Sequence, residues 1–149
     1  MFNRKIILGS VAGAVIAASA FAAAHSPVTQ RQEAMKAVGG QMRTLGGMAQ
    51  GKIEYDDFAA ISAFEIMRNA SATAQPLFAS AGDGSEENRA LPEIWADGSD
   101  FDARMTQMIA DLDAAIAAEP ADQASFAPLF GAVAGNCKGC HEKYRAPEE

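Results

Sequence analysis

The chain has few thiols, few imidazoles and no strand-like pattern. Its 149 residues include two cysteines and two histidines, so any site built from several such ligands must draw on nearly all of them. After the first 24 residues, no segment alternates apolar and polar side chains over the length of a β-strand. Apolar residues recur instead every three or four positions. These absences predict an all-α protein.

Runs of positive charge are also missing. The sequence has 12 Lys and Arg against 19 Asp and Glu, a net charge of −7. Such a surface repels nucleic acid and anionic lipid and favours partners with basic docking patches. The sequence shows no nucleophile–base arrangement, phosphate-binding loop or second metal cluster either, so an enzyme is not expected.

The N-terminus has the pattern of an export signal. Arg4 and Lys5 precede an uncharged, mostly apolar run that ends in small residues. This pattern predicts a signal peptide over residues 1–24, cleaved near residues 22–24. An uncleaved membrane anchor is the alternative, because the run is close to the length that a bilayer needs. Cleavage leaves one exported domain, residues 25–149, with a net charge of −9 and no membrane attachment.

Four stretches with helical periodicity follow the leader. Acid, glycine, serine and proline separate the second stretch from the third, so residues 78–99 are expected to form one long loop. Four amphipathic helices fold most simply as an antiparallel four-helix bundle, which can hold a cofactor in its core. The expected helical stretches are residues 28–50, 56–75, 101–116 and 126–144.

Both cysteines lie in the fourth stretch, as Cys137-Lys-Gly-Cys140-His141. A thioredoxin-like dithiol begins a helix that follows a strand, and no strand is expected here. A zinc site lacks ligands, because His25 is the one remaining histidine. A disulfide across three helical residues would close almost no chain and gain little stability.

The sequence C-x-x-C-H is typical of covalent haem c attachment. Cys137 and Cys140 share a helix face, so both could form thioethers to the porphyrin edge while His141 binds the iron. The export signal and the absence of other cysteines agree with this interpretation. A second axial ligand is usually methionine or histidine. No methionine follows His141, so a methionine ligand must come from upstream.

Three segments together resemble one family. They are "RQEAMKAVGGQM" at residues 31–42, "PEIW" at residues 92–95 and "CKGCHEKYR" at residues 137–145. Over the whole mature chain the sequence is similar to the cytochrome c′ family, the class II cytochromes c. The resemblance implies a periplasmic bacterial protein with one covalent haem c in a four-helix bundle.

The family has two branches that differ at one position of the first helix, four residues after an arginine. Low-spin members carry a methionine there that binds the iron, and they transfer electrons. Five-coordinate members generally carry an apolar residue and bind NO or CO, although some have an unligated methionine. Here the two positions are Arg31 and Met35. The resemblance favours Met35 as the second axial ligand, and core packing is the alternative role.

The resemblance also implies haem contacts outside the motif. Arg31 and Gln32 of the first helix would lie beside the haem propionates or the ring edge, with a solvated helix start as the alternative. Ser85 and Glu86 of the long loop would touch the haem edge. Arg145 would lie near the His141 face, or serve as a positive charge at a helix C-terminus. The implied contact residues are Arg31, Gln32, Ser85 and Glu86.

These observations predict a one-electron carrier with His/Met-ligated iron. A soft methionine sulfur favours Fe(II), and redox proteins are the expected partners. A five-coordinate protein that binds NO or CO is the alternative. A monomer and a homodimer both agree with the resemblance. Trp95 is expected to anchor the long loop, and Tyr144 to pack in the core.

Overall fold

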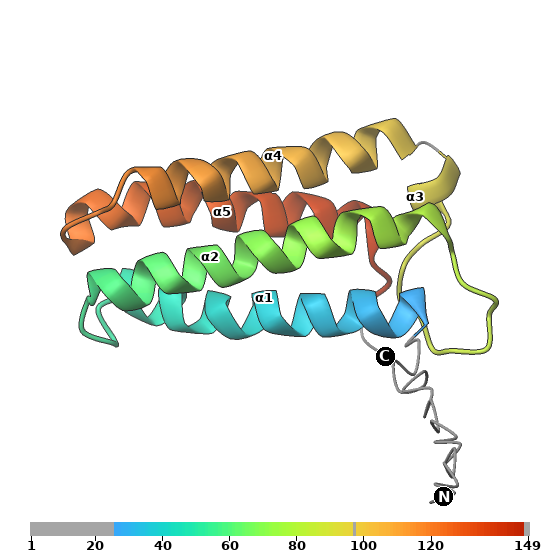
Figure 1. The fold of residues 1–149 in the computed structure, drawn as a ribbon, viewed down its shortest axis with the longest axis horizontal. Coiled ribbons are helices and arrows are strands. Elements are labelled where there is room, and N and C mark those ends of the chain that lie inside the picture. The colour runs from blue at the N-terminus through green and yellow to red at the C-terminus, as the bar shows by residue number, and fades with distance from the viewer. Residues whose placement is uncertain (1–25, 97, 148–149) are drawn as a thin grey trace, which may run out of the picture.

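The computed structural model describes residues 26–96 and 98–147. The predicted signal peptide therefore lies outside the described residues. Four long helices lie side by side as an antiparallel bundle, which confirms the predicted fold (Figure 1). They are α1 (Pro27–Ala49), α2 (Asp57–Ala74), α4 (Gly98–Ala117) and α5 (Gln123–Tyr144).

Side-chain caps set the beginnings of three of these helices. The side chains of Ser26, Asp56 and Asp122 accept hydrogen bonds from backbone amides in the first turns of α1, α2 and α5. At α5 the cap is reciprocal, because Ser125 also bonds back to the Asp122 backbone. Each cap satisfies an amide that has no partner within its helix. The helix that carries the cysteine motif, α5, therefore begins at a fixed residue, and this start sets its register against the other helices.

The segment between α2 and α4 is more structured than the sequence suggested. The prediction of one loop over residues 78–99 is wrong in part, because the segment contains the end of a 3-10 helix, η1 (Gln75–Ala79), and a short helix, α3 (Glu93–Ala96). Pro76 lies in the first turn of η1, where a missing amide costs nothing. The carbonyl of Pro92 accepts hydrogen bonds from the amides of Trp95 and Ala96 and so starts α3.

The core consists of two clusters at opposite ends of the bundle. We call the larger one the turn-end cluster, because it lies toward the α1–α2 and α4–α5 turns. Its buried members are Val38, Leu45, Met48, Ala60, Ala63, Phe64, Met67, Met108, Leu112, Ala115, Phe126 and Val133.

The second, which we call the motif-end cluster, lies where α3 and the C-terminal end of α5 meet (Figure 1). Its buried members are Ala74, Ile94, Phe101, Met105 and Tyr144. None of the helices within residues 26–96 and 98–147 combines the length and the apolar character needed to cross a membrane.

Candidate functional site

The two thiols of the motif occupy neighbouring turns of α5. Both are free and partly buried, and burial raises the pKa of each thiol. Cys140 packs against the motif-end cluster. Cys137 lies against its own helix, with Sγ 3.8 Å from the Val133 carbonyl oxygen. The pair therefore faces the border between the bundle core and the surface, where a covalently attached group could be half enclosed.

His141 lies one turn after Cys137. Burial lowers the pKa of its imidazole, and the positive charges of Arg145 and Arg89 lower it further. A lowered pKa keeps the imidazole neutral near pH 7, and the neutral form is the one that binds a metal. Of the described residues, no group of three or more His, Cys, Asp or Glu is arranged to hold a metal ion by itself.

A surface cavity of about 750 Å³ opens beside the motif. Cys137 and His141 both line it, together with Arg89 and Arg145. One thiol and the imidazole thus face the same open space, while the second thiol faces the adjoining apolar cluster. Two thiols and a neutral imidazole within two helical turns are the donor set that haem c attachment uses, so the residues fit this cofactor.

Met35 lies on α1 at the contact between the two core clusters. It is half-buried, and it packs against both clusters. Its contact with the motif-end cluster places it on the same apolar surface as Cys140. One turn later, a Cβ added at Gly39 would meet no atom within 4 Å, so α1 is open beside Met35. Met105 on α4 is the other methionine in the motif-end cluster.

Arg31 is not the solvated residue that one alternative expected. It is 4% exposed, and its guanidinium donates to three carbonyl groups of the segment that follows α2. The guanidinium also lies 4.9 Å from the Phe78 ring centroid and 5.8 Å from that of Trp95. Desolvation lowers its pKa, although nearby Glu86 opposes the shift. In this structure Arg31 fastens α1 to the loop. Its acceptors are the carbonyl oxygens of Leu77, Ser80 and Ala81.

Two of the other predicted haem-contact residues also join α1 to the loop that follows α2. Gln32 is exposed, and its side chain donates to the Glu87 carbonyl at 2.7 Å. The Glu86 carboxylate accepts hydrogen bonds from Ser26 and Thr29 at the start of α1, where the helix dipole favours a negative charge. Gln32 and Glu86 therefore lie near Arg31.

Ser85 is exposed and bonded to Asp83 within its own turn. The structure therefore does not bring its hydroxyl to the start of α1 with the other predicted contacts.

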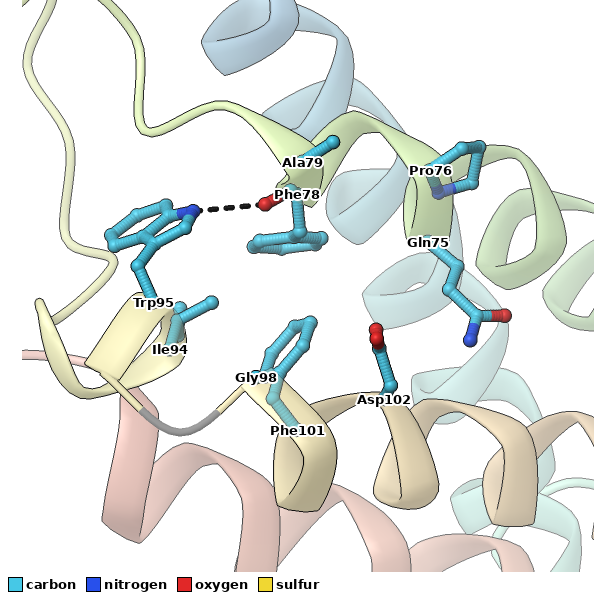
Figure 2. A pocket seen from close by; sticks show the side chains of 9 residues that line it. All are labelled: Gln75, Pro76, Phe78, Ala79, Ile94, Trp95, Gly98, Phe101 and Asp102. Carbon is cyan, nitrogen blue, oxygen red and sulfur yellow. Dashed lines mark hydrogen bonds between the residues drawn. The ribbon is translucent and has the colours of Figure 1, made fainter.

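Trp95 anchors the segment between α2 and α4. Its indole nitrogen donates to the Phe78 carbonyl at 2.8 Å, as Figure 2 shows. The two aromatic rings border a second cavity of about 620 Å³, together with Phe101. Cys137, Cys140 and His141 do not line this cavity, so we assign it to the packing of the loop rather than to the motif.

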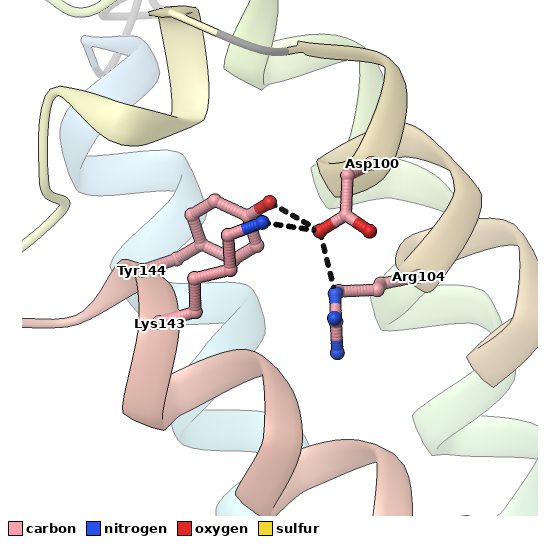
Figure 3. A network of polar contacts seen from close by, with 4 residues as sticks. All are labelled: Asp100, Arg104, Lys143 and Tyr144. Carbon is pink, nitrogen blue, oxygen red and sulfur yellow. Dashed lines mark hydrogen bonds and ion pairs between the residues drawn. The ribbon is translucent and has the colours of Figure 1, made fainter.

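The sequence did not lead us to predict a polar network that lies beside the motif. One oxygen of Asp100 accepts hydrogen bonds from Tyr144 at 2.5 Å, Arg104 at 2.8 Å and Lys143 at 2.9 Å (Figure 3). These donors hold the pKa of the carboxyl far below its usual range. The network ties the start of α4 to the last turn of α5. The four-residue spacing of Asp100 and Arg104 on one helix was the available sequence signal.

Comparisons with known proteins show the family to which the chain belongs. Residues 26–145 match the family model described as Cytochrome C′. The chain is similar to a cytochrome c′ from Rhodopseudomonas palustris, 31% identical over 95% of this chain and 97% of that protein. A cytochrome c-556 from Agrobacterium fabrum is also 31% identical, over 95% of this chain and 94% of its own.

Solved structures show the same fold. Cytochrome c′ from Rhodopseudomonas palustris superposes with a TM-score of 0.78 at 27% identity, over 84% of this chain and 99% of that one. A nitric oxide complex of a cytochrome c′ variant from Alcaligenes xylosoxidans gives a TM-score of 0.70 at 28% identity. The coverage there is 81% of this chain and 94% of that one.

Proposed function

Because the chain belongs to the cytochrome c′ family of haem proteins, which are not enzymes and bind one covalent haem c, we propose that it is a periplasmic one-electron carrier. Cys137 and Cys140 are the cysteines of the attachment motif near the C-terminus. In the proposed site His141 would bind the haem iron, and Met35 would be the second protein ligand. The bound haem supplies one-electron chemistry at iron, and a methionine ligand favours Fe(II).

The position of Met35 carries the proposal for the electron-transfer branch. Its side chain shares the motif-end cluster with Cys140, although the two residues come from the first and last helices of the bundle. It is also half-buried, as a side chain would be if one of its faces were left to a ring. Gly39 leaves the neighbouring turn of α1 without a side chain, so a flat group could approach the backbone there.

The five-coordinate, gas-binding function is the second candidate. A solved relative is a nitric oxide complex, and the relatives include both cytochromes c′ and a cytochrome c-556. The same structure would serve this function if Met35 packed against the core without binding the iron. The two candidates therefore differ in one bond, between the Met35 sulfur and iron.

The visible spectrum of the ferric protein tests that bond. We expect a low-spin spectrum with a methionine-to-iron band near the red edge for the wild-type protein. Met35→Ala should become high-spin and should bind CO when reduced. Met105→Ala is the matched control, because it removes a methionine from the same cluster yet should leave the spectrum low-spin. A wild-type protein that is already high-spin and binds CO readily would overturn the carrier function and favour gas binding.

A further inference from the structure

One short segment between α2 and α4 is attached to both the first and the last helix of the bundle. It comprises residues 86–91, and we call it the brace. The segment between α2 and α4 lies at the end of the bundle where α1 begins and α5 ends (Figure 1). Met35 and His141, the proposed iron ligands, lie on these two helices.

The first half of the brace is attached to the start of α1. The Glu86 carboxylate accepts hydrogen bonds from the hydroxyl groups of Ser26 and Thr29. The carbonyl oxygen of Glu87 accepts a hydrogen bond from the side-chain nitrogen of Gln32 at 2.7 Å. These contacts hold the brace against the first two turns of α1.

The second half of the brace is attached to the end of α5. The Ala146 amide donates to the Arg89 carbonyl at 2.8 Å. The Arg89 side chain donates in return to the Ala146 carbonyl, from Nε at 3.0 Å and from Nη2 at 2.6 Å. The Leu91 amide donates to the carbonyl of Tyr144, the last residue of α5, at 2.9 Å. The two segments thus form a short antiparallel bridge.

Very little chain separates the two attachments. Glu87 and Arg89 are two residues apart, so the chain between them spans at most about 7 Å. A segment this short has no slack when both of its ends are held. The brace therefore limits how far the start of α1 can move from the end of α5.

Each attachment lies about one helical turn from a proposed ligand. On α1, Gln32 precedes Met35 by three residues. On α5, Tyr144 follows His141 by three residues. The Arg145 amide also donates to the His141 carbonyl at 3.2 Å, so the turn that carries the imidazole continues into the bridge. A shift at either attachment therefore reaches a ligand through a single turn of helix.

Iron ligation depends on such positioning. A binding site works only when its side chains are held within about 0.5 Å of the productive geometry. Outer contacts that orient metal ligands change metal affinity by about 10–100-fold. Met35 lies on a different helix from the attachment motif, so its approach depends on how α1 is held. The motif-end cluster packs against Met35 as well, but apolar packing is not directional.

We propose that the brace positions Met35 and His141 so that both can bind one haem iron, with Arg89 as the positioning residue at the α5 attachment. A tight brace favours the His/Met-ligated carrier, and a slack brace leaves Met35 packed in the core. This inference rests on the proposed electron-transfer function, because it concerns the bond between Met35 and iron that this function requires.

Lengthening the brace tests the proposal without removing a side chain. Two glycines inserted after Asn88 lie between the two attachments, whereas two glycines inserted after Gly84 lie outside them. Gly84 suits the control, because a Cβ added there would meet no atom within 4 Å. Each insertion interrupts one local bond, from the Ala90 amide to Asn88 at 3.0 Å or from the Ser85 amide to Asp83 at 2.9 Å. Insertions into exposed loops cost little stability.

Imidazole competes with Met35 for ferric iron, so its affinity for the holoprotein reports how firmly Met35 is bound. We expect the insertion after Asn88 to weaken the methionine-to-iron band and to raise the imidazole affinity about tenfold. The insertion after Gly84 should change the affinity by less than about 1.5-fold. Equal imidazole affinities in both variants and a low-spin wild type would overturn the proposal.

Substitution of Arg89 tests the α5 attachment by itself. Arg89→Gln should raise the imidazole affinity at least about threefold, because it removes the bonds from the side chain to Ala146. Arg89→Lys should recover part of the loss, since one donor remains. Arg68→Gln is the matched control, because Arg68 is also partly buried and joins α2 to Asp113 on α4 at 2.9 Å. An equal effect of Arg68→Gln and Arg89→Gln would contradict a positioning role for Arg89.

Amide hydrogen exchange in the holoprotein tests the link independently of iron ligation. The amides of Thr29 and Gln30 on α1 both donate to Ser26, beside the first attachment. Arg89→Gln should speed their exchange at least about threefold, whereas Arg68→Gln should leave it unchanged. Unchanged exchange in Arg89→Gln would mean that the brace does not link the two helices and would overturn the proposal. A high-spin wild-type spectrum would instead overturn the proposed electron-carrier function, so the two failures are distinguishable.

Discussion

The two core clusters differ in what surrounds them. The twelve buried members of the turn-end cluster are all apolar and come from the four long helices. The motif-end cluster has five buried members and packs against Cys140, Met35 and Trp95. Polar contacts surround this cluster. Arg31 joins α1 to the loop, and Asp100 joins the start of α4 to the end of α5. One end of the bundle therefore stabilises the fold, and the other leaves room for a cofactor.

The aromatic contacts of the two clusters differ in their polar partners. In the turn-end cluster the Phe126 ring packs on Tyr55 at 5.3 Å and on Phe130 at 5.7 Å, and the Tyr55 hydroxyl donates to a backbone carbonyl, that of Pro120. At the motif end Phe101 meets Tyr144 edge-on at 5.3 Å, and the Tyr144 hydroxyl then donates to Asp100. Packing at the motif end thus continues into polar contacts, which are strong only when their geometry is kept.

Removing a large side chain from the turn-end cluster should have the largest effect on stability. Phe126 is fully buried. Phe126→Ala should lower the free energy of unfolding by about 3–5 kcal/mol, because it removes apolar contacts and leaves a cavity. Urea unfolding followed by circular dichroism measures the loss. The visible spectrum of the folded fraction should stay unchanged, since the substitution lies far from the motif.

An exposed phenylalanine is the matched control for that change. Phe58 is 84% exposed, so Phe58→Ala should change the free energy of unfolding by less than about 0.5 kcal/mol. If both substitutions cost the same, burial in the turn-end cluster would not be what stabilises the bundle. If Phe126→Ala changed the spin state of the iron, a substitution in the turn-end cluster would affect the haem site, and the two ends would not be independent.

Helical periodicity was enough to predict the fold. Each expected helix begins and ends within three residues of an observed one. The largest errors at a start are three residues: α4 begins at Gly98 rather than near Phe101, and α5 begins at Gln123 rather than near Phe126. Its cap, formed by Asp122 and Ser125, is polar and precedes the apolar stripe, so a search for apolar periodicity passes over it.

The site was predictable where it is local in sequence. Cys137, Cys140 and His141 lie within two helical turns, so their chemistry could be predicted from the motif. The role of Arg31 could not, because its carbonyl acceptors lie on a loop without periodicity, 46–50 residues away. The contact of Asp100 with Tyr144 depends on the register between α4 and α5, which no single segment specifies.

Removing Arg31 should have an intermediate effect at the motif end. Arg31→Ala removes one donor from each of three carbonyl groups, of which that of Ala81 still accepts from Asn88. It also removes the contacts with Phe78 and Trp95. We expect a loss of about 1–3 kcal/mol in the free energy of unfolding and faster amide hydrogen exchange in residues 77–96. Arg31→Lys should recover part of the loss, because lysine lacks the planar fork that reaches several acceptors.

Arg43 provides the control for the loss of a positive charge on α1. It is exposed, so Arg43→Ala should leave both the stability and the exchange in residues 77–96 nearly unchanged. Accelerated exchange across the turn-end cluster in Arg31→Ala would contradict the assignment of this residue to the motif end.

The smallest expected effect concerns Asp100, and it depends on pH. The bonds from Tyr144, Arg104 and Lys143 hold the pKa of its carboxyl far below that of the unfolded chain, which is near 3.9. The folded state therefore gains stability from the carboxylate above about pH 5, and this gain is lost as the pH falls toward the folded pKa. Asp100→Asn should lower Tm by a few degrees at pH 7, and its difference from the wild type should shrink at about pH 3.

Thermal unfolding of Asp100→Asn, Asp102→Asn and the wild type at both pH values measures this difference. Asp102 is exposed on the same helix, so Asp102→Asn controls for the loss of one negative charge near the start of α4. Acid effects on the haem ligands are shared by all three proteins and cancel in the comparison. A Tm difference that stays constant between the two pH values, or that equals the control, would mean that Asp100 does not stabilise the motif end through its carboxylate.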